Sequence, residues 1–337
     1  MFRQYIKELL LGILESFKML KSNNFLKILN RISRKIFLKN EIQLIVENNS
    51  DLISNKLFNA ILDNKPIMVA RFGATELMCL VNFIGVKRGK PNLLKYVFGV
   101  GLDWWWRKDS LDQIEKWSGF FPSTISNLER FCNLQLNDTI DLDLFASWLE
   151  NEIYLEVCLS HTYKFKAIYL DPFWSKNPWT MALEGKKVLV VHPFARTIES
   201  QYKKRELLFN DNLLPSFQLQ TIQAVQSIAG NQTQFVDWFE ALEFMKSEID
   251  KRDYDICLIG CGAYGFPLAA HVKRSGKKAI HMGGSLQLLF GIKGKRWENP
   301  SYNSIYNYAQ LINEHWVYPS DEEKPENATL VEGACYW

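Results

Sequence analysis

The sequence has little that suits a secreted or membrane-spanning protein. Its six cysteines form no C-x-x-C pair and have no close histidine partner, which argues against a disulfide framework or a structural zinc site and fits a reducing cytoplasm: Cys79, Cys132, Cys158, Cys257, Cys261 and Cys335. The longest early apolar run, Leu9 to Leu14, is broken by Glu15 and is too short for a transmembrane helix. No small-residue cleavage site follows this run, so we expect no signal peptide either.

An excess of one charge is also missing from most of the chain. The 40 Lys and Arg residues against 37 Asp and Glu residues give a net charge of +3, too balanced to indicate nucleic-acid binding. Residues 1–40 are the exception, because nine basic and two acidic side chains give this segment a net charge of +7. The rest of the chain is therefore slightly acidic, and the overall 47% of apolar residues is enough for a sizeable core.

The basic N-terminal segment carries two helical patterns. Apolar residues recur at three- and four-residue intervals over 2–21 and again over 25–37, with lysines and arginines on the opposite side of the first pattern. A basic amphipathic helix can lie in an anionic membrane surface, with its apolar side in the acyl boundary. The same stripe can instead pack on the body of the protein or on another subunit, and the periodicity favours neither.

From residue 46 the chain alternates between short apolar runs and helical patterns. The apolar runs are typical of buried strands: 67–70, 167–170, 188–191, 256–259 and 279–281. Amphipathic patterns lie between them: 75–83, 111–117, 125–134, 197–209, 235–250 and 266–274. The alternation predicts a Rossmann-like, three-layer α/β domain with a mostly parallel sheet over residues 46–315, between a basic segment, 1–45, and a C-terminal tail, 316–337.

Glycine loops follow two of these predicted strands, where ligands bind in parallel sheets. Gly260-Cys261-Gly262-Ala263-Tyr264-Gly265 is a G-x-G-x-x-G pattern between a strand and a helix, a context that offers close backbone approach and a helix start to a phosphate. A NAD site normally adds an acidic residue at the end of the next strand, but this strand ends in His281-Met282-Gly283-Gly284. A glycine turn that only packs a helix onto a strand is the structural alternative.

Basic residues follow the second glycine loop. Lys293, Lys295 and Arg296 lie among glycines and could neutralise a diphosphate, although such runs are also common in solvated turns. The sequence contains no G-x-x-x-x-G-K-[ST] motif, which disfavours a P-loop kinase or ATPase.

The loop after residues 67–70 is Arg71-Phe72-Gly73-Ala74-Thr75-Glu76. Thr75 suits a helix N-cap and Glu76 suits the first helical turn, which would account for both residues structurally. Glu76 is also a carboxylate at the carboxyl end of a strand, where it can act as a base or an ion ligand. Arg71 is an unusual core residue unless it is paired or faces a ligand.

Two further strand ends carry polar residues. His192 and Arg196 follow the run at 188–191, and Asp171 follows the run at 167–170. His192 could bind a phosphate or act as a base, and it could equally be a hydrogen-bonded structural residue.

Together these loops resemble the GT-D-type glycosyltransferases of bacterial surface-polysaccharide and glycoprotein clusters. Residues 69–76, with the sequence VARFGATE, are similar to the family's R-[FY]-G-D-G-E segment, and the blocks 259–265, 281–284 and 291–297 reinforce the similarity over residues 46–315. The resemblance implies transfer of a sugar from a nucleoside diphosphate donor, with a divalent ion, Mn²⁺ or Mg²⁺, held by the two acids of D-x-E.

The chain departs from the family pattern where Ala74 replaces the Asp. One carboxylate is a poor site for a hard divalent ion, which requires several oxygen ligands. Either Asp171 joins Glu76 in a metal site, or cations stabilise the departing diphosphate instead, which we favour: Arg71, Lys293, Lys295 and Arg296. The departure is also compatible with a non-catalytic member of the family.

We therefore expect a cytoplasmic glycosyltransferase, held at the inner face of the membrane by residues 1–40, that extends a glycan or lipid-linked acceptor. Glu76 is expected to be the catalytic base. The residues expected to bind the nucleotide or its diphosphate are Arg71, Gly73, Thr75, His192, Arg196, Gly260, Gly262, Ala263, Tyr264, Gly265, Gly283, Gly284, Lys293, Lys295 and Arg296. The alternatives are a non-catalytic nucleotide-binding or scaffold subunit of a polysaccharide assembly complex and a NAD-dependent oxidoreductase.

Overall fold

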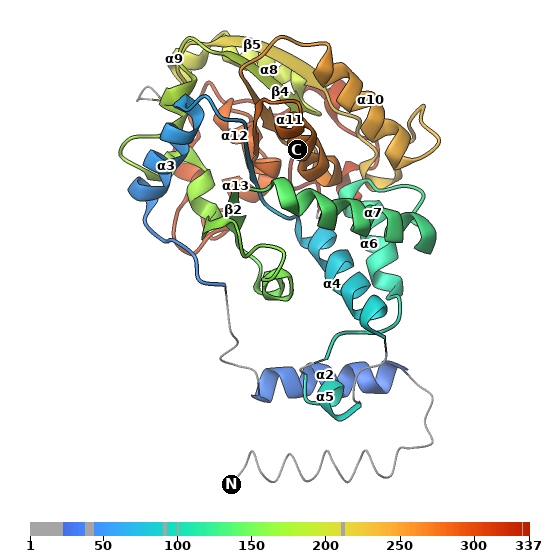
Figure 1. Cartoon of the computed structure of the whole chain (residues 1–337). Helices are drawn as coiled ribbons and strands as arrows, with labels where there is room; N and C mark the ends of the chain where they lie inside the picture. The colour runs from blue at the N-terminus through green and yellow to red at the C-terminus, as the bar shows by residue number, and fades with distance from the viewer. Residues whose placement is uncertain (1–22, 38–43, 90–92, 100, 210–212, 332) are drawn as a thin grey trace. The chain divides into compact units, whose positions relative to one another are not determined.

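The computed structural model describes residues 23–37, 44–89, 93–99, 101–209, 213–331 and 333–337 (Figure 1). Its α-helices are α2 (Asn23–Phe37), α3 (Ser50–Leu62), α4 (Ala74–Arg88), α5 (Leu93–Val97), α6 (Lys108–Ser118), α7 (Ile125–Asp138), α8 (Ala195–Tyr202), α9 (Arg205–Leu208), α10 (Trp238–Asp250), α11 (Gly265–Arg274), α12 (Leu286–Leu289) and α13 (Lys295–Glu298). Its strands are β1 (Ile67–Ala70), β2 (Leu144–Ser147), β3 (Tyr163–Lys166), β4 (Lys187–His192), β5 (Gln218–Gln223), β6 (Ile256–Ile259) and β7 (Lys278–His281). The helical pattern predicted over 2–21 lies outside the described residues.

The described chain divides into two compact units that are each discontinuous in sequence. The larger unit comprises residues 44–80 and 108–337, and the smaller unit contains α2 and residues 81–107. The chain passes from the larger unit to the smaller one within α4. The predicted tail, 316–337, belongs to the larger unit together with the whole sheet.

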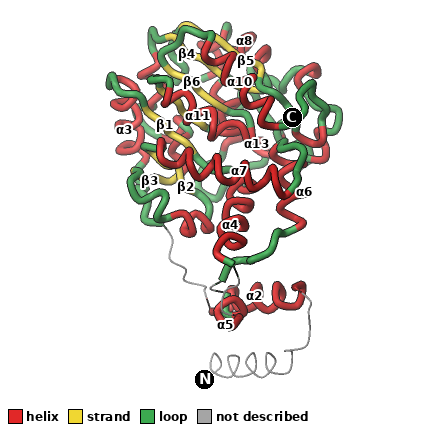
Figure 2. Tube along the Cα trace, turned by 45° about the vertical axis from the view of Figure 1, so that its right-hand side comes forward, coloured by secondary structure: helices red, strands yellow, loops and turns green. Residues whose placement is uncertain are grey.

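The larger unit is built on one seven-stranded sheet in the order β3-β2-β1-β7-β6-β4-β5, and all of its strand pairs are parallel. In the middle of the sheet, Val69 of β1 pairs with Ile280 of β7 and Ile280 pairs with Leu258 of β6. Figure 2 shows the strands in yellow with α11 beside them. The prediction of an α/β domain with a parallel sheet is confirmed, and the carboxyl ends of all strands share one edge.

Four of the predicted strands form as expected, and one does not. The run 167–170 forms a 3-10 helix that follows β3, because the backbone pairing with β2 ends at Lys166. The apolar runs also gave no indication of β2, β3 and β5. β5 has the sequence QLQTIQ at the edge of the sheet, where a polar strand can face solvent, so it lacks the continuous apolar run of a central strand.

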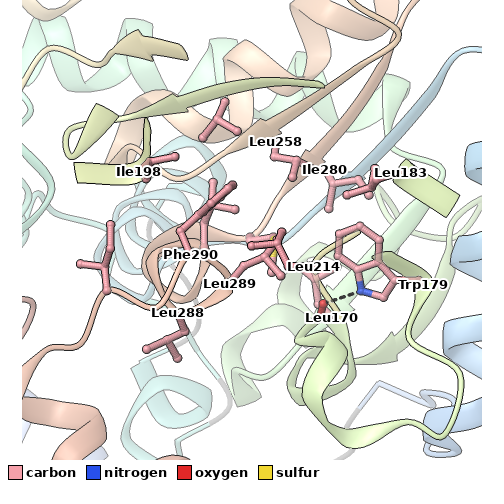
Figure 3. Packing of buried hydrophobic residues seen from close by; sticks show 14 of the residues in the cluster. Leu170, Trp179, Leu183, Ile198, Leu214, Leu258, Ile280, Leu288, Leu289 and Phe290 are labelled. Carbon is pink, nitrogen blue, oxygen red and sulfur yellow. Dashed lines mark hydrogen bonds between the residues drawn. The ribbon is translucent and has the colours of Figure 1, made fainter. Parts of the chain in front are cut away.

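Alternate residues of the central strands bury against two different helical layers. α11 packs on β1, β6 and β7, and both α7 and α10 pack on α11. The other face of the sheet forms a large apolar cluster with α3, α8 and α12; Leu258 and Ile280 come from the strands, and Trp179 lies nearby (Figure 3). The Trp179 indole donates a hydrogen bond to the Leu170 carbonyl at 2.9 Å, so its one polar atom is satisfied.

The smaller unit contains the second basic helical pattern as α2. Leu29, Asn30 and Ser33 are buried, and the Asn30 side chain donates to the carbonyl of Tyr96. Ile28 and Ile32, one turn apart, are 55% and 45% exposed. The apolar stripe of this helix is therefore only partly used for packing within its unit. No helix in the described part of the chain has the length and apolar character that a transmembrane span requires.

Candidate functional site

The loops that follow β1, β7, β6 and β4 meet at the carboxyl edge of the sheet. These four strands are consecutive neighbours, so their ends lie side by side. A Cβ atom added to Gly260 would lie 2.6 Å from the Gly283 carbonyl oxygen and 2.8 Å from His192 Cδ2. A Cβ atom on Gly283 would lie 3.3 Å from Nη1 of Arg71. The glycine turns therefore approach one another closely, and the space between them is too narrow for larger residues.

A pocket of about 200 Å³ lies at this edge of the larger unit. It is lined by most of the residues that the sequence singled out: Arg71, Gly73, Thr75, Glu76, His192, Gly260, Gly262, Ala263, Tyr264, Gly283, Gly284 and Arg296. The structure does not bring Arg196, Gly265, Lys293, Lys295 or Asp171 into the lining. The loops after β2 and β5 and the C-terminal residues complete the pocket wall.

Arg71 is a half-buried cation with unused hydrogen-bond donors. Its guanidinium lies 4.6 Å over the ring of Trp148, and its Nε donates to the Phe72 carbonyl at 3.2 Å. Within the described part of the chain this is the one hydrogen bond found for the guanidinium, so both Nη groups are available to a ligand. The next residue, Phe72, is buried and stacks on Phe266 of α11 with ring centroids 4.7 Å apart.

Glu76 lies in the first turn of α4, which begins at Ala74, so Thr75 lies inside the helix rather than at its N-cap. The Glu76 side chain is buried against Gly73, where an added Cβ atom would lie 1.8 Å from Oε2. Burial raises the pKa of Glu76, while a hydrogen bond from Ser118 and the charge of Arg71 act in the opposite direction. A carboxyl with a raised pKa is better matched to proton abstraction near neutral pH.

Two buried histidines line the pocket as different neutral tautomers. His192 Nδ1 accepts a hydrogen bond from the Phe194 amide at 3.0 Å, which assigns the proton to Nε2. His281 Nδ1 lies 3.3 Å from the Ile259 carbonyl oxygen, which assigns its proton to Nδ1 and leaves Nε2 as an acceptor. Burial lowers the pKa of both histidines to about 3, so both rings are neutral at physiological pH.

The start of α11 supplies backbone donors to the pocket. Gly262 has a φ of +58°, a left-handed conformation that favours glycine, and it begins the short 3-10 turn, Gly262–Tyr264, that leads into the helix. No acceptor for the amides of Gly262 and Ala263 is found among the described residues. These amides and the positive end of the ten-residue helix suit a negatively charged group.

The start of α8 is already occupied by a carboxylate of the chain itself. Glu323 is 2% exposed, and it accepts hydrogen bonds from the amides of Arg196 and Thr197 and from the Thr197 hydroxyl. The Arg196 side chain is exposed and pairs with Glu322. Glu323 therefore occupies the backbone donors at this helix start, and Glu322 pairs with the Arg196 side chain. Of the two predicted residues in the loop after β4, His192 is the one that faces the pocket.

The other predicted residues outside the lining have identified surroundings. Lys293 Nζ lies 3.8 Å from Glu298 Oε1 and 4.6 Å over the ring of Tyr318, and Lys295 is exposed. Gly265 packs beneath the pocket, where an added Cβ atom would lie 2.1 Å from Cε1 of His281. Arg296 is therefore the cation of its segment that reaches the lining, where it lies 4.5 Å over the Tyr336 ring.

The residues present do not fit a divalent metal ion. Ala74 stands where the family pattern has an acid, and Asp171 is buried away from the lining, where it accepts a hydrogen bond from Tyr308 at 2.5 Å. No group of three or more His, Cys, Asp or Glu residues close enough to hold a metal occurs in the described part of the chain. We therefore derive no step through a metal ion.

Several pocket residues were not found from the sequence. The sequence pattern predicts His281 only as the end of a strand, although its place beside Gly283-Gly284 marks it as an edge residue. Trp148 follows β2, a strand that no apolar run predicts, so the sequence gives it no predicted position. Tyr336 and Trp337 lie far along the chain from every motif, and their return to the pocket has no local signal.

Comparison of the chain with protein-family models, with curated proteins and with solved structures gives no match.

Proposed function

We propose that the chain is a glycosyltransferase that moves a sugar from a nucleoside diphosphate donor to a glycan or lipid-linked acceptor. The resemblance of residues 69–76 to the GT-D-type family implies this chemistry, and Arg71 carries the proposal. It is a half-buried guanidinium with free Nη donors in a pocket that also contains the start of α11. A pyrophosphate offers the negative charge and the acceptor oxygens that this arrangement attracts.

In this proposal the diphosphate lies against the amides of Gly262 and Ala263, with Arg71 and Arg296 beside it. The acceptor hydroxyl gives its proton to Glu76 as its oxygen bonds to the anomeric carbon. The bond between that carbon and the phosphate oxygen breaks, and its electron pair leaves with the diphosphate. The two arginines and the Nε2–H of His192 offset the charge that grows on the leaving group, the role for which the family uses a metal ion.

Binding of a nucleoside diphosphate is the first test, by titration calorimetry of the full chain with UDP, GDP, CDP and ADP. Arg71→Ala should weaken the binding about ten- to a hundredfold, because it removes charge-assisted hydrogen bonds. Arg196→Ala is the matched control and should leave affinity unchanged, because Arg196 is exposed and pairs with Glu322. Absence of binding by all four nucleotides would end the proposal.

Turnover separates the enzyme from its main alternative, a non-catalytic nucleotide-binding or scaffold subunit, which the replacement of the family Asp by Ala74 favours. A panel of nucleotide sugars is screened for diphosphate release with and without Mn²⁺. The enzyme should release diphosphate without added metal, and Glu76→Gln should abolish release while nucleotide binding persists. Binding without release from any donor would support the scaffold.

We also propose that residues 1–40 hold the protein at the cytoplasmic face of a membrane, near a lipid-linked acceptor. The net charge of +7 over this segment attracts anionic headgroups, and exposed Ile28 and Ile32 on α2 can enter the acyl boundary. Ile28→Glu with Ile32→Glu should abolish flotation with anionic liposomes. Leu62→Glu, at a 51% exposed position of the larger unit, is the control that should still float. Equal flotation of both variants would contradict this attachment.

A further inference from the structure

Two large aromatic side chains of the pocket remain exposed. Trp148 and Trp117 both belong to the lining, and they are 48% and 39% exposed. Other tryptophans of the same unit, such as Trp179 and Trp238, are fully buried. Exposed indole faces in the lining of a pocket provide flat apolar surfaces on which a ligand can stack.

Trp148 is held in place before any ligand binds. Its indole Nε1 donates to the Phe72 carbonyl at 2.9 Å, and the Arg71 guanidinium lies over its ring. Its backbone amide donates to the buried carboxyl of Glu152 at 3.3 Å. Hydrogen bonds therefore hold both the indole ring and the backbone of Trp148. Because the ring is already ordered, the side chain loses little conformational entropy when a ligand stacks on it.

Trp117 is connected to the surroundings of Glu76 through its neighbour in the chain. It lies in the last turn of α6, next to Ser118, which hydrogen-bonds to the Glu76 carboxyl. The carbonyl groups at the end of a helix have no partners within the helix and can accept hydrogen bonds from hydroxyl groups. Gln135, also in the lining and fully buried, has an Oε1 atom for which no partner is found among the described residues.

From this arrangement we infer that Trp148 and Trp117 form a saccharide subsite for the acceptor. A pyranose has an apolar C–H face that stacks on an indole and hydroxyl groups that donate to carbonyl and amide oxygens. A sugar bound by these side chains lies in the pocket that Glu76 also lines. The subsite's role as acceptor site rests on the proposed function, whereas saccharide binding by the two indoles does not.

Saturation-transfer NMR on the full chain tests the binding without nucleotide. The probes are the methyl glycosides of glucose, galactose and N-acetylglucosamine, each at millimolar concentration. At least one probe should receive saturation, chiefly at the C–H groups of one ring face. Trp148→Ala and Trp117→Ala should each weaken its binding about two- to tenfold, and Trp148→Phe should retain most of it. Phe244→Ala, at a 40% exposed position outside the lining, is the matched control and should have no effect.

Three results would overturn the inference. They are no binding of any glycoside, binding that is unchanged in both tryptophan variants, and loss of UDP affinity in those variants with saccharide binding intact. The last result would assign the indole faces to the nucleobase. Failure of the proposed function can be distinguished from failure of this inference. In the first case the chain binds none of the nucleotides but still binds a saccharide.

Discussion

The buried carboxyl of Glu152 should make the free energy of unfolding depend on pH, and its surroundings determine the size of this effect. Glu152 is fully buried, and it accepts hydrogen bonds from the Ser147 hydroxyl and the Trp148 amide. Burial raises its pKa from 4.5 to about 7, and these hydrogen bonds and the charge of Arg71 offset burial only in part. Glu152→Gln keeps the shape of the side chain and removes its titration.

The sign of the effect follows from proton binding. Between pH 4.5 and 7 the folded chain holds a proton on Glu152 that the unfolded chain has lost, so stability falls as the pH rises through this window and stays lower above it. At about 1.36 kcal/mol for each pH unit between the two pKa values, the full loss is about 3 kcal/mol. Roughly 2.5 kcal/mol of it accumulates between pH 5 and pH 8.

Urea denaturation of both proteins at pH 5, 6, 7 and 8 measures this difference. Glu152→Gln should gain about 2.5 kcal/mol of unfolding free energy relative to the wild type over that range. Glu150→Gln, at an exposed position of the same 3-10 helix, is the control and should run parallel to the wild type. If the unfolding free energies of Glu152→Gln and the wild type change in parallel with pH, burial does not raise the pKa of this carboxyl.

Three further changes test the packing around the pocket. Gly73→Ala places a Cβ atom 1.8 Å from Glu76 Oε2 and should displace this carboxylate. We expect diphosphate release to fall about a hundredfold, while the melting temperature stays within a few degrees. Unchanged diphosphate release would show that Glu76 is not the base. Gly265→Ala meets the His281 ring and should cost about 1–3 kcal/mol in urea denaturation, with an unaltered midpoint counting against this contact. Glu323→Gln should destabilise the chain by about 1 kcal/mol in the same assay by removing the charge at the start of α8, a loss that added salt should reduce.

The sequence was informative about the middle of the sheet because burial on both faces leaves a continuous apolar run. Ile67–Ala70 and Ile256–Ile259 are fully buried strands, and each was visible as such. At the edge, Gln218–Gln223 is polar enough to resemble a loop. The run 167–170 is apolar because it joins the cluster with α3, so hydrophobicity alone did not distinguish a 3-10 turn from a strand.

The site was predictable to the extent that parallel topology fixes it. Once the strands are parallel, Arg71, Gly260 and Gly283 must share an edge, whatever the order of the strands around them. The partners of the cations are not fixed in this way. Arg196 pairs with a glutamate 126 residues away, and Lys293 lies over the ring of Tyr318, which comes from the C-terminal segment. Such long-range contacts leave no periodic or spacing signal in the chain.

The ring stack of Phe72 on Phe266 links the loop after β1 to the start of α11 within the pocket. One ring adjoins the guanidinium on the β1 loop, the other belongs to the first turn of α11, and their planes are inclined by only 18°. The contact between the two rings therefore fixes the spacing between the Arg71 guanidinium and the backbone donors at the start of α11. A smaller side chain at Phe266 would loosen this spacing while leaving Arg71 and the amides of Gly262 and Ala263 in the chain.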